Sequence, residues 1–265
     1  MSDHLLSLAS GVLPEFTPEQ TAAAAVAAGW PAVGIWVEPA TWTSAIAADV
    51  RRRVEDAGVI VLDVEVIWLK PGADDPDHLR IIDAGEAIGA RNVLVVSSDP
   101  DPQATADKLA RLVKHAASAK MRVCLEFAAF TEVKSLAAAL DIIARSHSDT
   151  GLLIDPLHFA RTGATPDMLR GINPHRLPYA QFCDAAATGP AAENVPAIIE
   201  EALDLRLDVG QGALPLKALL DTMPAQIPLS IELRSKALRD AYGDPDARAA
   251  ALLAATRQGL QALSG

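Results

Sequence analysis

Four apolar runs in the second half of the chain contain or end in a side chain that carries oxygen. Glu126 follows "VCL", Asp155 follows "LLI", Gln181 lies in "YAQFCDA" and Glu232 follows "LSI". If these runs are neighbouring strands, the three carboxylates meet and raise one another's pKa sharply, because like charges repel. A divalent cation would remove that conflict. A ligand set rich in oxygen suits Mg²⁺ or Mn²⁺ better than a closed zinc site.

Five further polar residues are candidates for contact with a substrate. His158 and Asp184 each come three residues after one of the four side chains above, and Glu65 lies in the third apolar run. Trp68 in the same run could line the pocket as well, or belong to the core. Arg206 and Arg234 are candidate anchors for an anion, although each could instead be a solvated or charge-paired surface residue. No glycine-rich phosphate loop is visible, so a phosphorylated substrate is not implied.

The elements that must position these residues alternate along the whole chain. The strand-like runs cover about 4–10, 32–38, 59–69, 92–99, 122–128, 151–159, 179–185 and 228–235. The helix-like segments between and after them cover about 17–29, 43–57, 77–89, 102–119, 132–146, 165–172, 214–223 and 244–263. Continuous apolar strands separated by helices indicate a parallel sheet covered by helices.

Eight such units in 265 residues predict an α/β protein with a single (β/α)₈ TIM barrel that spans residues 1–265 as one domain. A doubly wound open sheet is the alternative, but it usually has fewer units and a glycine-rich turn after its first strand. The segment "LASGVLPEF" has no such turn. In a barrel the carboxyl ends of the strands share one face, so we expect the polar side chains to meet there. The long stretch 186–213 should be functional or carry a short helix.

Composition narrows the class of protein. The net charge of −11 makes nucleic acid an improbable partner, because a phosphate backbone would be repelled. No apolar run reaches the ~20 residues that span a bilayer, and the first residues lack the pattern of a signal peptide. Cys124 and Cys183 lie in apolar runs and are expected to be buried, reduced thiols, which suits a cytoplasmic protein. We expect a small-molecule substrate and no membrane partner. Whether the chain forms a homo-oligomer is left open by the sequence.

The segments "CLEF", "IDPLHFARTG", "YAQFCDA", "GQGALPL" and "SIEL", in this order and spacing, resemble the sugar-phosphate isomerase/epimerase superfamily, also called xylose isomerase-like or AP-endonuclease-like barrels. The resemblance covers the whole chain and is most specific over residues 122–235. It implies that one divalent metal, Mg²⁺ or Mn²⁺, is bound by Glu126, Asp155, Gln181 and Glu232. It also implies that the two glutamates form the catalytic acid/base pair.

The chain departs from the family pattern at the seventh strand. The family usually has histidine where this chain has Gln181. The amide oxygen of glutamine can still bind a hard cation, but the loss of the nitrogen ligand puts zinc in doubt. The glutamine in "GQGALPL" stands where the family has glutamate, and there we interpret Gly210 and Gly212 as turn residues.

These features predict a divalent-metal-dependent isomerase or epimerase. Its substrate would be a keto-sugar or a related hydroxy-carbonyl compound, and proton transfer by the two glutamates would pass through an enediolate. A metal-dependent dehydratase or lyase on the same barrel is one alternative, since loss of a β-hydroxyl can follow the same proton abstraction. A non-catalytic binding barrel is the other, and the altered residue at 181 keeps it open.

Overall fold

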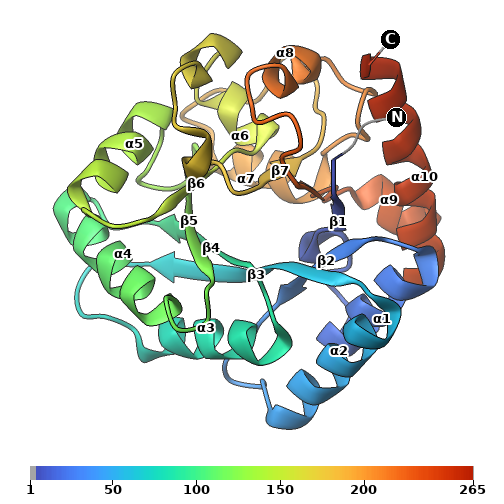
Figure 1. Ribbon diagram of the computed structural model, residues 1–265. Helices are drawn as coiled ribbons and strands as arrows, with labels where there is room; N and C mark the ends of the chain where they lie inside the picture. The colour runs from blue at the N-terminus through green and yellow to red at the C-terminus, as the bar shows by residue number, and fades with distance from the viewer. Residues whose placement is uncertain (1–3, 265) are drawn as a thin grey trace.

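Eight parallel strands form a sheet that curls into a barrel (Figure 1). The computed structural model describes residues 4–264. The strands are β1 (Leu6–Leu8), β2 (Ala32–Trp36), β3 (Ile60–Leu69), β4 (Asn92–Ser97), β5 (Arg122–Glu126), β6 (Gly151–Leu153), β7 (Ala180–Phe182) and β8 (Leu229–Ile231). Their order is β6-β5-β4-β3-β2-β1-β8-β7, so strands that follow one another in the chain lie side by side and β1 pairs with β8. A parallel bridge between Ile154 and Ala180 joins the two ends of the sheet, which nearly closes the barrel. The predicted TIM barrel is confirmed.

Helices lie around the outside of the strands (Figure 1). The α-helices are α1 (Pro18–Ala28), α2 (Ser44–Ala57), α3 (Pro76–Ile88), α4 (Pro102–Ala116), α5 (Leu136–Arg145), α6 (Pro156–Arg161), α7 (Val195–Asp204), α8 (Leu216–Leu220), α9 (Lys236–Ala241) and α10 (Pro245–Ser264). Three 3₁₀ turns are η1 (Ser10–Val12), η2 (Pro166–Leu169) and η3 (Pro174–Arg176).

The sequence determines the ends of several helices directly. At the start of α1 the Thr17 hydroxyl accepts a hydrogen bond from the Gln20 amide while the Gln20 side chain accepts one from the Thr17 amide. This reciprocal capping supplies acceptors for amides that have no partner inside the helix. Gly29 ends α1 with φ of 76°, a left-handed conformation that glycine adopts without steric cost.

The sixth unit differs from the sequence expectation. The predicted strand 151–159 ends at Leu153, and α6 starts at Pro156. Proline fits the first turn of a helix, and Asp155 in front of it caps the new helix. The segment predicted as a helix over 165–172 contains only the 3₁₀ turn η2. The long stretch 186–213 carries α7, as expected.

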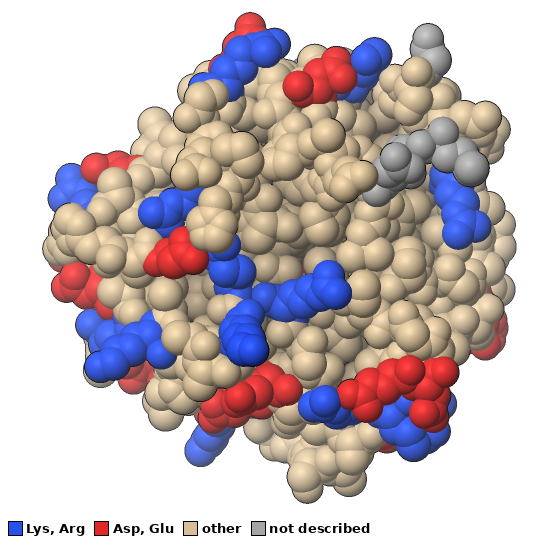
Figure 2. Space-filling view, in the orientation of Figure 1, with Lys and Arg blue, Asp and Glu red and all other residues tan. Residues whose placement is uncertain are grey.

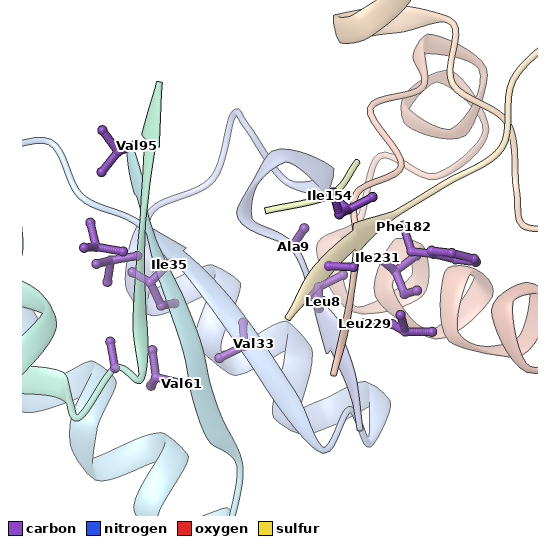
Figure 3. Close-up of a cluster of buried hydrophobic side chains, with 14 of the residues drawn as sticks. Leu8, Ala9, Val33, Ile35, Val61, Val95, Ile154, Phe182, Leu229 and Ile231 are labelled. Atoms are coloured by element: carbon purple, nitrogen blue, oxygen red, sulfur yellow. The ribbon is translucent and has the colours of Figure 1, made fainter. Parts of the chain in front are cut away.

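Apolar side chains from the strands pack together in the core (Figure 3). Leu8, Val33, Ile35, Phe182 and Ile231 are at most 1% exposed. Burial of one such side chain contributes ~1.5–3 kcal/mol relative to its exposure, so these strands are held firmly in place. Both cysteines are buried and free, as the apolar runs predict.

Most of the charged side chains lie at the surface. On the face shown in Figure 2, acidic and basic side chains lie next to one another around the edge. Many of these surface side chains form salt bridges within one helix, such as Arg51–Glu55 and Lys217–Asp221. Within residues 4–264, no helix combines the length and the apolar character that a membrane span needs.

Candidate active site

A cavity of about 300 Å³ opens among the carboxyl ends of the strands. Glu126 is the last residue of β5, and Glu232 follows β8 directly. Both line the cavity together with Glu65 of β3 and Gln181 of β7. These four side chains are at most 6% exposed. The parallel barrel therefore brings together polar residues that are up to 167 positions apart in the chain (232 − 65).

Asp155 is not among the residues that line the cavity. Its Oδ1 atom accepts hydrogen bonds from the backbone amides of Leu157 and His158, at 2.7 and 3.2 Å. Its Oδ2 atom lies 2.5 Å from Nη1 of Arg206. Burial is the largest single influence and would raise the pKa of Asp155, but the charge and hydrogen bond of Arg206 together with His158 outweigh it and lower that pKa to about 2. Asp155 is therefore an ionised carboxylate that holds α6 and Arg206 at the same time.

Arg206 lies in the segment after α7 and is only 2% exposed. Its Nη2 atom is 2.8 Å from Oε2 of Glu232, so the guanidinium joins two of the four predicted metal ligands, Asp155 and Glu232. Its Nε atom donates to the carbonyl oxygen of Ala202 at 2.8 Å. Arg206 was predicted as a substrate contact. It does line the cavity, but its hydrogen bonds are made with the protein.

Glu232 is held by two arginines. Its Oε2 atom faces Arg206 as described, and its Oε1 atom accepts a hydrogen bond from Nε of Arg234 at 3.1 Å. Burial raises the pKa of Glu232 to about 7, although both arginines oppose that rise. Both protonation states of this carboxyl are therefore within reach near neutral pH.

Glu126 forms no salt bridge with any residue in the range 4–264. Its Oε1 atom is buried and accepts no hydrogen bond from residues 4–264. Burial raises the pKa of Glu126 well above its usual range, and the charges of Asp155 and Glu232 raise it further. A buried carboxylate oxygen without a partner is costly unless a proton or a cation joins it.

Glu126 is one of three side chains whose possible ligand atoms converge. Glu126, Asp155 and His158 each offer one atom, and the three atoms lie within 4.8 Å of one another. This acidic and histidine-containing cluster overlaps the predicted ligand set only in Glu126 and Asp155. The cluster does not include Glu232. It does include His158, which was predicted as a substrate contact.

His158 lies in the first turns of α6 and is 4% exposed. Its Nε2 atom is 3.5 Å from Nη2 of Arg206, and its ring meets the ring of Phe130 edge to face, with centroids 5.3 Å apart. Burial lowers the pKa of His158 to about 4, and the nearby Arg206 contributes to the decrease. The imidazole is therefore neutral at pH 7, the form that can bind a metal or accept a proton.

Gln181 and Glu65 form a second pair at the cavity. The Gln181 side-chain amide nitrogen donates to Oε1 of Glu65 at 3.2 Å, and the Ser10 hydroxyl donates to Oε2 of Glu65 at 2.8 Å. The amide orientation that makes this bond leaves the Gln181 oxygen as the atom that could bind a cation. Glu65 thereby positions the predicted ligand Gln181.

Asp184 does not line the cavity. Its carboxylate accepts hydrogen bonds from the backbone amides of Ala185, Gly210, Gly212 and Leu214, at 2.8–3.1 Å. Gly210 has φ of 82°, and a Cβ on Gly212 would lie 2.3 Å from the carbonyl oxygen of Ala185. The turn role expected for both glycines is confirmed. The predicted substrate contact Asp184 instead fixes the loop that follows Arg206.

Trp68 lines the cavity, and its indole nitrogen donates to the Ser98 hydroxyl at 2.8 Å. The sequence did not reveal two further aromatic residues of the cavity wall, Trp36 and Phe130. Trp36 and Trp68 are 43% and 37% exposed. A tryptophan at the end of an apolar run is the feature of the sequence that could have identified Trp36.

The donor set fits a divalent cation. The unpartnered oxygen of Glu126, the ionised Asp155 and the neutral His158 provide hard oxygen ligands and one nitrogen, which Mg²⁺, Mn²⁺ and Zn²⁺ all accept to different degrees. The nitrogen ligand weakens the expectation of an all-oxygen site. Arg206 competes for Asp155 and Glu232, because a guanidinium and a metal ion need the same negative charge.

Solved structures share this fold. A xylose isomerase-like TIM barrel/4-hydroxyphenylpyruvate dioxygenase fusion protein superposes with a TM-score of 0.79 at 21% identity, and the match covers 98% of this chain and 44% of the fusion protein. The IOLI protein, whose structure holds a zinc atom, gives 0.77 at 14% identity and covers 97% of both chains.

Structural neighbours that are described as enzymes include two epimerases and a probable dehydratase. L-ribulose 3-epimerase gives a TM-score of 0.69 at 18% identity and covers 98% of this chain and 96% of its own. The probable 3-DHS dehydratase AsbF from Bacillus anthracis gives a TM-score of 0.70 at 12% identity, and the match covers 94% of this chain and 98% of AsbF. A search of curated protein sequences found no match. The model of the xylose isomerase-like TIM barrel family matches residues 22–259. The chain therefore belongs to the xylose isomerase-like TIM barrel family.

Proposed function

We propose that this protein is a divalent-metal-dependent isomerase or epimerase that acts on a small hydroxy-carbonyl compound. The observation that carries the proposal is the placement of Glu126 and Glu232, two buried carboxyl groups from β5 and the end of β8, in the wall of one cavity. Glu126 also belongs to a cluster of side chains that could hold a metal ion. Epimerases of the same fold support it.

The metal would be held by Glu126, Asp155 and His158, with Gln181 and Glu232 as further ligands. When bound, it would polarise a substrate carbonyl and so acidify the neighbouring C–H bond. Mg²⁺ and Mn²⁺ fit the oxygen-rich set, and the zinc in the IOLI protein keeps Zn²⁺ as an outcome of the metal titration.

The protein's own residues would move the proton. One glutamate would remove a proton from the carbon beside the carbonyl, and the other would return one to the opposite face or to the neighbouring carbon. The first outcome is epimerisation and the second is isomerisation. The aromatic walls formed by Trp36, Trp68 and Phe130 would keep bulk water away from the exchanging proton.

Dehydration of a hydroxy-carbonyl compound is the second candidate. It starts from the same proton abstraction, and the returned proton would go to a departing β-hydroxyl instead of to carbon. The probable dehydratase among the structural neighbours favours this candidate. Formation of a conjugated, ultraviolet-absorbing product would distinguish it from isomerisation.

Solvent deuterium exchange tests the proposal. Wild-type protein with Mn²⁺ should incorporate deuterium from D₂O into one member of a panel of keto-sugars and hydroxy-keto acids. Glu232→Gln should reduce that exchange by about 10²–10⁴-fold, which is the usual contribution of a positioned base. Glu200→Gln, a change of the same kind in an exposed residue of α7, is the matched control. Exchange at the wild-type rate in Glu232→Gln would refute the two-glutamate mechanism, and metal and ligand binding without any exchange would favour a binding barrel.

A further inference from the structure

The two arginines of the cavity differ in what their N–H groups bind. Arg206 has five N–H donors, and the protein offers five acceptors: the carbonyl oxygen of Ala202, Oδ2 of Asp155, the Cys183 sulfur at 3.3 Å, Oε2 of Glu232 and Nε2 of His158. A buried guanidinium with every donor occupied is a structural counter-ion. Arg206 therefore has no free donor for a ligand.

Arg234 has donors to spare. Its Nε atom donates to Glu232, but neither of its terminal amino groups donates a hydrogen bond to any residue in the described range 4–264. Its side chain is 17% exposed and lines the cavity of about 300 Å³ beside Glu232. Of the two arginines in the cavity wall, Arg234 is thus the one that can present paired N–H groups to a ligand.

Gly11 fixes the position of this guanidinium. A Cβ atom on Gly11 would lie 2.4 Å from Nε, 2.7 Å from Cζ and 2.8 Å from Nη2 of Arg234. The guanidinium therefore lies directly against the backbone of η1, in space that any other residue would fill. Ser10 in the same turn holds Glu65, so one short turn positions groups of opposite charge.

The charges around the cavity restrict where an anion could bind. Glu65, Glu126 and Glu232 line the wall, so a negative group placed near them would be repelled. A guanidinium fork matches the two oxygens of a carboxylate. A cavity of about 300 Å³ has room for a small ring or a short chain between its aromatic side chains, and the terminal amino groups of Arg234 are the N–H donors that it offers to a carboxylate.

We propose that Arg234, seated on Gly11, binds a carboxylate of the substrate, so that the substrate class is a small hydroxy-keto acid rather than a neutral sugar. This inference rests on the proposed function only in so far as it calls the bound molecule a substrate. The anion site itself can be tested without turnover.

Benzoate and benzamide form a matched pair of probes, because they have the same shape and differ in charge. Calorimetric titration, with EDTA and again with Mg²⁺, should show that the wild-type protein binds benzoate at least about tenfold more tightly than benzamide in both conditions. Arg234→Met should abolish that preference. Arg239→Met removes the same charge from α9, outside the cavity, and should retain it. Equal binding of the two probes by wild type, or a preserved preference in Arg234→Met, would overturn the proposal.

Two further measurements keep the inference falsifiable if Arg234→Met is unstable. Gly11→Ala should weaken benzoate binding with little loss of stability, because the added methyl group displaces a flexible side chain rather than backbone. Unchanged benzoate affinity in Gly11→Ala would contradict the proposed seat. Tighter binding of phenyl phosphate than of benzoate, lost in Arg234→Met, would overturn the assignment to a carboxylate. Absent deuterium exchange with an intact benzoate preference would refute the proposed function and leave the anion site standing.

Discussion

Nη1 of Arg206 lies 2.5 Å from Oδ2 of Asp155, and the same guanidinium reaches Glu232 at 2.8 Å. A residue of the chain thus supplies positive charge where the sequence predicts a metal ion. All three side chains are buried, so little solvent screens this interaction.

Removal of the Arg206 charge should strengthen metal binding. We expect Arg206→Met to bind Mn²⁺ at least about tenfold more tightly than wild type, which corresponds to ~1.4 kcal/mol, because two carboxylates become free of their competitor. Calorimetric titration measures the change, and Mn²⁺ should also raise the Tm of the variant more than that of wild type.

Arg161→Met is the control for this prediction, because Arg161 is also a buried arginine but pairs with Glu201 and the Ala186 carbonyl oxygen and with none of the predicted metal ligands. Its Mn²⁺ affinity should match that of wild type. Weaker Mn²⁺ binding by Arg206→Met would show that the guanidinium helps to assemble the metal site instead of competing for it.

Asp155 combines two functions that a pair of variants can separate. Asp155→Ala and Asp155→Asn both remove the charge beside Arg206, but only alanine removes the cap of α6, since asparagine caps helices as well as aspartate does. Denaturant unfolding should show Asp155→Ala to be less stable than Asp155→Asn by about 1 kcal/mol. Both should lose tight Mn²⁺ binding, and an unchanged affinity in either variant would remove Asp155 from the ligand set.

Asp184 should control the order of the loop after Arg206. Asp184→Asn replaces one acceptor oxygen by an NH₂ group that faces backbone amides, so part of the four-bond cluster is lost. We expect a loss of ~1–3 kcal/mol in unfolding free energy. Hydrogen exchange should accelerate at the amides of Gly210 and Gly212 and stay slow in β2. Unchanged protection at both glycines would contradict this role.

The buried ion pair between Asp99 and Lys108 should make stability depend on pH. The two atoms lie 2.8 Å apart, both side chains are at most 7% exposed, and the Lys108 hydrogen bond lowers the pKa of Asp99. A lowered pKa in the folded state stabilises the protein above the pKa of unfolded aspartate, near ~3.9, and this stabilisation is lost as the pH falls through the folded-state pKa.

Asp99→Asn should therefore cost about 3–5 kcal/mol at pH 7, because it leaves the Lys108 ammonium buried without its partner. The difference from wild type should narrow at pH 3. Asp74→Asn, which breaks an exposed pair with Arg111, should cost no more than ~1 kcal/mol. Denaturant unfolding of the three proteins at both pH values checks this, and a pH-independent difference for Asp99→Asn would be inconsistent with the ion pair.

Local patterns were sufficient to predict much of the fold. Strand-like runs alternate with helix-like segments, and caps such as Thr17 and Gly29 mark helix ends, because hydrogen bonding and backbone sterics at these positions act over a few residues. The strand ends then predict which side chains meet, since parallel strands in a barrel present their carboxyl ends on one face. Glu126, Gln181 and Glu232 reach the cavity wall for this reason, and Asp155 lies close to Glu126.

Short irregular segments were harder. The sequence "IDPLHF" reads as a continuing apolar strand, yet Asp155 caps a helix there and carries His158 with it. The competing signals, an apolar run and an Asp-Pro helix start, act over the same few residues, so their balance is not visible in the pattern alone.

By itself the sequence determined the barrel and the chemical character of its mouth, because both follow from residue types at periodic positions. Only the tertiary structure decided which polar group pairs with which. In the structure Asp184 binds the backbone amides of the loop, and Arg206 is surrounded by hydrogen-bond acceptors. The guanidinium of Arg234 lies against Gly11, and its terminal amino groups donate no hydrogen bond within residues 4–264. These outcomes depend on contacts between segments far apart in the chain, where burial removes water as an alternative partner and makes each hydrogen bond a competition among the few groups within reach.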